Sequence, residues 1–335
     1  MDFLSILVAL VVFLVVVLFH EGGHFLAAKA VGIRVNEFAV GMGPAILRSQ
    51  RGETQYSLRL LPIGGYCAME GEDDASDDPR SYDSAKPWQR FITILAGPMM
   101  NLVIAVLFFS IFNGILGRGT TTVDTVVPES GFAEAGLQPG DTIQMLDGQN
   151  VDSLQEIRAH LAKSEGSPIE VIYTRDGVKQ TPVRIAPVQQ EGRWVFGFTA
   201  KTQSNVLWAI EDGVAMTGHL FGELFDVFAR LLTGRLSLQA VSGPVGVVSA
   251  IGQATKQGFS SVLFFSAYIS LNLAFFNLLP IPALDGSKLL FIIIEKLRGK
   301  AMKKELETRI TTIGFLFLMG LILLVSVKDV IGLFR

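Results

Sequence analysis

The chain has 335 residues, of which 50% are hydrophobic and only 18% are charged, and its mean hydropathy is +0.44. This balance is too apolar for an ordinary soluble enzyme, and the net charge of −3 argues against a nucleic-acid partner, because phosphate binding needs clustered lysine and arginine. The single cysteine, Cys67, excludes an internal disulfide framework and a cysteine-rich zinc module, so histidines and carboxylates must hold any metal.

Four runs without Asp, Glu, Lys or Arg are long enough to cross a bilayer, which takes roughly 20 residues. They are Phe3–His20, Phe91–Gly117, Gln257–Leu284 and Ile310–Val327. We therefore expect transmembrane helices at about 3–24, 91–116, 258–284 and 310–327. The first run has neither a basic segment before it nor a small-residue cleavage site, so we expect a retained span and not a signal peptide.

The distribution of basic residues predicts the orientation. The segment 29–90 carries eight Lys and Arg, and the segment 288–309 carries seven. Short basic loops stay in the cytoplasm. We expect both segments inside, and both termini and the long segment 118–256 outside.

The outside segment alternates short strand-like and helical stretches, which predicts an α+β module over 118–202. Its stretch VVPESGFAEAGLQPGDTIQMLDGQNV resembles a PDZ domain through the placement of Gly136, Leu137, Gly140, Asp141 and Ile143. That resemblance implies binding of peptide ends by strand addition. In residues 203–256, apolar residues recur at helical spacing among charges, so we expect a peripheral amphipathic linker and not a fifth span.

The stretch HEGGH lies at the inner end of the first run. His20 and His24 are four residues apart and share one helix face, so their imidazoles can bind one zinc ion. Glu21 stands beside that face and can take a proton from the attacking water, as in the HExxH arrangement of metalloproteases. The alternative is a pair of interior polar residues with a structural role. Each charge at the bilayer centre costs about 2.5 kcal/mol or more, which favours the metal site.

Two histidines leave zinc without a third protein ligand. The remaining histidines, His160 and His219, fall in the outside segment. Asp285 follows a long uncharged run that Pro280 and Pro282 interrupt, and irregular backbone at membrane depth is tolerated where it lines a cavity. The predicted topology places Asp285 near the same membrane face as HEGGH. Its alternative role is a helix cap or interface residue.

Taken in order, several motifs make the chain resemble the site-2 protease family of intramembrane zinc metalloproteases, of the bacterial regulator-of-sigma-E type with a single PDZ domain. They are HEGGH, GMGP, SLRLLPIGGY, AGPMMN, SGPVG and NLLPIPALDG. The resemblance implies that His20, His24 and Asp285 bind zinc and that Glu21 is the catalytic base. It further implies that Asn277 and Asn272 lie near the substrate.

The same resemblance implies a membrane-re-entrant β-hairpin over about 38–69, with turn glycines Gly41, Gly43, Gly64 and Gly65 and an edge that pairs with the substrate. The expected fold is then a multi-pass α-helical membrane protein with four transmembrane helices, this hairpin and an extracytoplasmic α+β PDZ domain. Residues 1–117 and 257–335 form the two halves of its membrane core.

By this resemblance the protein lies in the bacterial cytoplasmic membrane and cleaves within the span of a single-span protein that another protease has already cut. An anti-sigma factor and a signal-peptide remnant are examples. The PDZ domain either binds the new peptide end or excludes substrates with bulky outer domains, and the resemblance favours exclusion. Its partners are this substrate and the lipid bilayer.

Two positions depart from the family pattern. Gly22 follows the glutamate where a bulkier residue is usual, and Ser287 replaces the second glycine of Leu-Asp-Gly-Gly. Neither removes a ligand or the base. Two other classes of protein remain as alternatives: a membrane scaffold that uses only its PDZ domain, and a zinc transporter, which would usually place more polar residues along a pathway through several spans.

Overall fold

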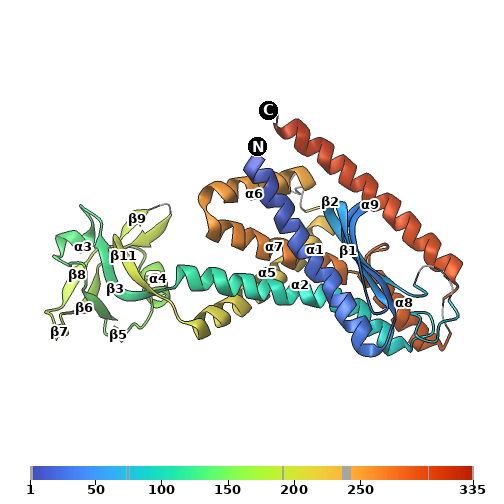
Figure 1. Cartoon of the computed structure of the whole chain (residues 1–335). Coiled ribbons are helices and arrows are strands. Elements are labelled where there is room, and N and C mark those ends of the chain that lie inside the picture. The colour runs from blue at the N-terminus through green and yellow to red at the C-terminus, as the bar shows by residue number, and fades with distance from the viewer. Residues whose placement is uncertain are drawn as a thin grey trace. The chain divides into compact units, whose positions relative to one another are not determined.

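The computed structural model describes residues 3–72, 74, 76–190, 192–235, 243–300 and 302–333, and it contains two compact units (Figure 1). Residues 1–112 and 212–335 form the first, called here the helical unit. Residues 113–211 are inserted into it and form the second, called here the α+β unit.

Four described helices are long and apolar enough to cross a membrane. They are α1 (Phe3–Val31), α2 (Pro87–Leu116), α7 (Phe259–Leu278) and α9 (Lys304–Leu333). The first turn of α1 and the last turns of α9 lie at the same end of the helical unit (Figure 1). Helix α5 (Val206–Leu232) is not among the candidate spans.

The helix ends differ from the expected span ends where local chemistry overrides hydropathy. Helix α7 stops at Leu278, short of the expected 284, because Pro280 lacks a backbone N–H and restricts the residue before it. Helix α1 runs on past residue 24 and ends before Gly32, whose φ of +86° cannot continue a helix. Helix α9 starts before residue 310 because its first, charged turns are helical without being apolar.

Packing in the helical unit joins segments from both halves of the chain. Helix α6 (Pro244–Gln257) packs on α1 through Ile251, against Val12 and Val16. Helices α2, α5 and α7 share a second cluster that is centred on Phe109 and Phe275. Of the expected peripheral linker 203–256, residues 236–242 lie outside the described residues.

Strands β1 (Val35–Arg51) and β2 (Thr54–Met69) form a two-stranded antiparallel sheet that bends back on itself. Residues 35–40 pair with 65–69 and also with 55–58, whereas 45–51 pair with 54–59. Among the described residues, no strand pairs with the outer edge of 65–69. One polar edge of backbone is therefore left open beside α1.

A polar network inside this sheet holds its segments together. The Glu37 carboxylate accepts hydrogen bonds from Ser57, Arg59 and Tyr66. Burial opposes ionisation of Glu37, but these three donors outweigh it and lower its pKa to about 2. Because Ser57 and Tyr66 lie on segments on either side of residues 35–40, the network fixes the register of the bent hairpin.

The α+β unit has a seven-stranded sheet in the order β11–β3–β4–β6–β7, with β5 beside β4 and β8 beside β6. Helix α4 (Leu154–Ser164) and the short α3 (Gly131–Glu134) accompany it. Its core is apolar and includes Phe132, Ile157 and Phe196. The strands are β3 (Arg118–Val126), β4 (Thr142–Leu146), β5 (Gln149–Asn150), β6 (Ile169–Arg175), β7 (Val178–Lys179), β8 (Val183–Ile185), β11 (Phe198–Gln203) and a separate pair, β9 (Val188–Gln190) and β10 (Arg193–Val195).

Candidate metal centre

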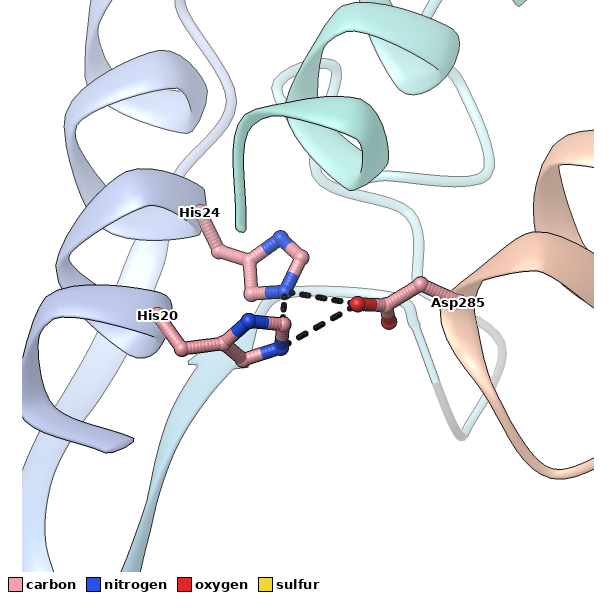
Figure 2. Close-up of side chains that lie close together, drawn as sticks. All are labelled: His20, His24 and Asp285. Atoms are coloured by element: carbon pink, nitrogen blue, oxygen red, sulfur yellow. Dashed lines mark hydrogen bonds and ion pairs between the residues drawn. The ribbon is translucent and has the colours of Figure 1, made fainter. Parts of the chain in front are cut away.

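Three predicted metal ligands converge at one point of the helical unit. His20 and His24 project from successive turns of α1 toward Asp285, the first residue of α8 (Asp285–Arg298) (Figure 2). Oδ2 of Asp285 lies 3.1 Å from Nε2 of His20 and 3.4 Å from Nε2 of His24. Within the described part of the chain, this is the one group of three or more His, Cys, Asp and Glu side chains whose ligand atoms all lie within 4.8 Å of one another.

Two glycines allow α2 to approach the histidines closely. A Cβ atom on Gly23 would lie 2.3 Å from the backbone oxygen of Ala96, and one on Gly97 would lie 2.3 Å from Nε2 of His24. Contact this close excludes a side chain at either position. A Cβ on Gly22 would meet no atom within 4 Å, so that departure from the family pattern leaves open space beside the helix.

The non-helical segment after α7 brings Asp285 into the site. Leu279 to Leu284 are not helical, and α8 begins at Asp285. A Cβ on Gly286 would lie 2.0 Å from the backbone oxygen of Leu279, so only glycine fits after the aspartate. Ser287 is buried and donates a hydrogen bond from Oγ to the backbone oxygen of Leu284 at 2.8 Å. Ser287, the second departure from the family pattern, therefore stabilises the first turn of α8.

Groups from α2 orient both imidazoles. Nδ1 of His24 lies 2.8 Å from the backbone oxygen of Thr93. That oxygen accepts a hydrogen bond from the Nδ1 N–H, which leaves Nε2 free for a metal. Nδ1 of His20 lies 3.2 Å from Nδ2 of the buried Asn101 amide, whose Oδ1 has no hydrogen-bond partner. Exchanging the amide nitrogen and oxygen, which the shape of the group allows, turns Oδ1 toward His20, where it accepts a hydrogen bond from the Nδ1 N–H.

The sequence alone predicted no role for Thr93 or Asn101. Asn101 could have been found from its polarity within the apolar run 91–117, where polar side chains are functional by default. Thr93 acts through a backbone oxygen, which leaves no mark in the sequence.

The donor set fits zinc. Oδ2 of Asp285 is buried without a hydrogen-bond partner, and two imidazole nitrogens and one carboxylate oxygen are a usual catalytic zinc set. Burial raises the pKa of the Cys67 thiol to about 12, which disfavours a thiolate ligand. His160 pairs with Asp147 at 2.9 Å in the α+β unit.

Glu21 shares a cavity of about 380 Å³ with the three ligands. Residues 66–69 form part of its wall, on the sheet edge that no described strand covers. Cys67 and Glu21 both line this cavity. A base, a candidate metal site and an open strand edge therefore face one cavity, here called the catalytic pocket.

The structure brings only some of the predicted substrate residues toward this pocket. A Cβ on Gly65 would lie 3.6 Å from Cγ of Glu21. Gly41, Gly43 and Gly64 adopt φ of +86°, +85° and +79° at the bends of the sheet. Asn272 and Asn277 lie on α7 outside the pocket lining, and the Asn272 amide donates to the Tyr268 backbone oxygen of its own helix.

This site and the four apolar helices define an integral membrane zinc metalloprotease, and comparison with known proteins gives its family. The family model described as Peptidase family M50 matches residues 8–321. The chain belongs to this family, the site-2 proteases.

The sequence aligns with those of its relatives over nearly the whole chain. A zinc metalloprotease of Clostridium perfringens is 37% identical over 329 residues, which cover 97% of this chain and 98% of the relative. The regulator of sigma-W protease RasP of Bacillus subtilis is 29% identical over 417 aligned positions, covering 98% and 99%. Among solved structures, the PDZ domain of an SdrC-like protein from Listeria innocua matches 25% of this chain and 96% of its own length, at 22% identity and a TM-score of 0.23.

Proposed function

We propose that this protein hydrolyses a peptide bond within the transmembrane segment of single-span membrane proteins. In this proposal His20, His24 and Asp285 hold zinc and Glu21 is the general base. The observation that carries it is the meeting of the three ligand atoms with Glu21 in one pocket beside an open strand edge.

Zinc, when bound, polarises the scissile carbonyl and lowers the pKa of water. Glu21 takes a proton from the attacking water and passes it to the leaving amine. Glu21 lines the same pocket as the three ligands, so its carboxylate is within the space that the attacking water occupies. Thr93 and Asn101 hold the two imidazoles in the tautomer that presents Nε2.

The substrate span has to be unwound before it is cut, because a helix occupies its carbonyls in internal hydrogen bonds. The outer edge of 65–69 offers backbone groups that can hold an extended segment by strand addition. Gly65 lets that segment approach Glu21 closely. Asn272 and Asn277 are proposed to contact the substrate farther along α7.

We propose that the catalytic pocket lies near the cytoplasmic face of a bacterial cytoplasmic membrane, and the basic segments 29–90 and 288–309 support this orientation. In this proposal residues 38–69 enter the membrane as a re-entrant hairpin, with the α+β unit outside. We propose that this unit is a PDZ domain that excludes substrates with bulky outer domains, so another protease cuts first. A relative that is named a regulator of sigma-W protease favours an anti-sigma factor as substrate.

The direct test is cleavage of a pre-trimmed single-span substrate in proteoliposomes by wild type and by Glu21→Gln at matched zinc content. We expect the variant to keep zinc and to cleave about 10²–10⁴-fold more slowly, because it lacks the proton acceptor. Equal cleavage by both proteins would contradict the role of Glu21. Zinc binding without cleavage by wild type would favour a scaffold, and zinc flux through both would favour a transporter.

A further inference from the structure

A second cavity of about 460 Å³ adjoins the catalytic pocket in the helical unit. Helix α8, the first turns of α2 and α9 and the segment between β2 and α2 supply its walls. Three ion pairs, Lys288–Glu72, Arg90–Glu295 and Lys304–Asp83, line it together with Glu307. A polar cavity of this volume holds on the order of ten water molecules.

Only two described residues line both the second cavity and the catalytic pocket, namely Glu72 and Lys288. Their Oε1 and Nζ atoms lie 2.6 Å apart. Burial disfavours the ammonium, but the neighbouring Glu72 carboxylate outweighs it, so the pKa of Lys288 lies above its ordinary value. The pair therefore closes the common wall as a charged contact between segments that are 216 residues apart.

Apolar side chains also line the two cavities that meet at this pair. Ile94, Met69 and Ile292 belong to one buried cluster, together with Leu289, the residue after Lys288. Among the described residues, no other polar side chain lines both cavities, so water that moves between them has to pass this pair. The Lys288 side chain is long and 36% exposed, so it can swing without unfolding its helix.

We propose that the second cavity is the water reservoir for hydrolysis and that the Glu72–Lys288 ion pair is its gate to the catalytic pocket. This inference rests on the proposed function, because each cleavage breaks one C–N bond and consumes one water molecule. The water oxygen joins the carbonyl carbon and the amine receives a proton through Glu21. An open pair admits water, and a closed pair keeps the catalytic pocket separate from the reservoir between cleavages.

Cys67 is a built-in reporter of this gate, because the sole cysteine lines the catalytic pocket and is buried. The measurement is the rate at which a small, charged, membrane-impermeant methanethiosulfonate labels Cys67 in the zinc-loaded full chain, read by intact mass. We expect Lys288→Ala to raise this rate at least tenfold. Lys288 is not among the groups that shift the pKa of Cys67, so a faster rate reports access.

Lys29→Ala is the matched control. Lys29 and Glu53 also form a lysine–glutamate pair at 2.6 Å, but neither residue lines the catalytic pocket or the second cavity. Lys29 lowers the pKa of Cys67, so its removal should leave labelling unchanged or slower. Equal acceleration by both variants would mean general loosening and would overturn the gate.

Thr311→Phe tests the reservoir, because Thr311 lines the second cavity alone. Added to Lys288→Ala, it should return labelling toward the wild-type rate, and in the wild-type background it should slow cleavage several-fold with zinc retained. Unchanged labelling in Lys288→Ala, or no effect of Thr311→Phe on either readout, would overturn the proposal. The labelling assay does not depend on proteolysis. If Lys288→Ala accelerated labelling of Cys67 but the wild-type protein cleaved no substrate, the gate would stand and only the proposed function would be contradicted.

Discussion

The α+β unit and the helical unit bury different kinds of side chain. The α+β unit closes around aromatic and aliphatic residues such as Phe132 and Phe196, which are at most 1% exposed. In the helical unit, protein buries only 28% of the most apolar window of α1 and 11% of that of α9. Polar groups, including His20 and Asn101, instead lie in its interior.

This difference teaches where to look for function in each unit. In water, apolar side chains turn inward, so a buried polar group is the exception that needs explanation. In lipid, apolar side chains need no protein cover, and a buried polar group marks a site. The His20–His24–Asp285 site is where the helical unit concentrates such groups.

The largest effect should come from breaking the close helix contact that the metal site requires. Gly97→Ala places a Cβ 2.3 Å from Nε2 of His24, so the imidazole must move. We expect loss of bound zinc and of cleavage, measured by metal analysis and the proteoliposome assay. Gly22→Ala is the matched control, because its Cβ meets nothing within 4 Å and should retain both properties. Zinc retained at wild-type affinity in Gly97→Ala would contradict the packing described for α1 and α2.

A smaller effect should follow from removing an orienting group without touching a ligand. Asn101→Ala leaves the Nδ1 proton of His20 without its buried acceptor, and loss of such partners weakens metal affinity about 10–100-fold. Competition with a zinc-binding dye measures this change. Asn272→Ala, whose amide donates to the Tyr268 backbone oxygen of its own helix, should keep the wild-type affinity. An equal loss in both variants would remove the special role of Asn101.

The α+β unit should respond to pH through one buried ion pair. The Asp141 carboxylate is 1% exposed and accepts two hydrogen bonds from Arg175 at 2.8 Å. Burial opposes its ionisation, but Arg175 and the Gln138 N–H outweigh it and lower the pKa of Asp141. A lowered folded-state pKa contributes stability above the unfolded value of about 3.9, and that stability is lost as the pH falls through the folded-state value.

We therefore expect the free energy of unfolding of the α+β unit to fall between neutral pH and about pH 3, more steeply in wild type than in Asp141→Asn. At neutral pH the variant should be less stable by about 1.5–3 kcal/mol. Hydrogen exchange of peptides from 113–211 in the full-length protein, corrected for intrinsic rates, measures both effects. Identical pH profiles in the two proteins would show that the Asp141–Arg175 pair contributes nothing measurable to the free energy of unfolding.

The parts of the site that depend on local spacing were predictable. The four-residue interval of HEGGH predicts two imidazoles on one helix face, and the predicted topology placed Asp285, the first acid after a long uncharged run, near the same membrane face. Contacts between distant segments were not predictable, since Asn101 meets His20 across 81 residues. The same holds for Glu72 and Lys288, because no short-range pattern marks which two charges will pair across 216 residues.

The fold shows the same division. Hydropathy predicts the four apolar helices, but the ends of these helices follow other causes. Pro280 ends α7 before the apolar run is over, and Lys29 lies within α1 although it is charged. The double pairing of residues 35–40 could not be predicted either, because Glu37 and its three donors come together only in the folded sheet.

The most direct test of the central claim is zinc K-edge X-ray absorption of the purified protein in detergent. The account predicts two imidazole nitrogens at about 2.0–2.1 Å and carboxylate or water oxygen at about 2.0–2.2 Å, with His20→Ala and Asp285→Ala each losing one scatterer or the metal. A sulfur scatterer at about 2.3 Å, or a spectrum that neither substitution changes, would show that zinc is held elsewhere and would contradict the account.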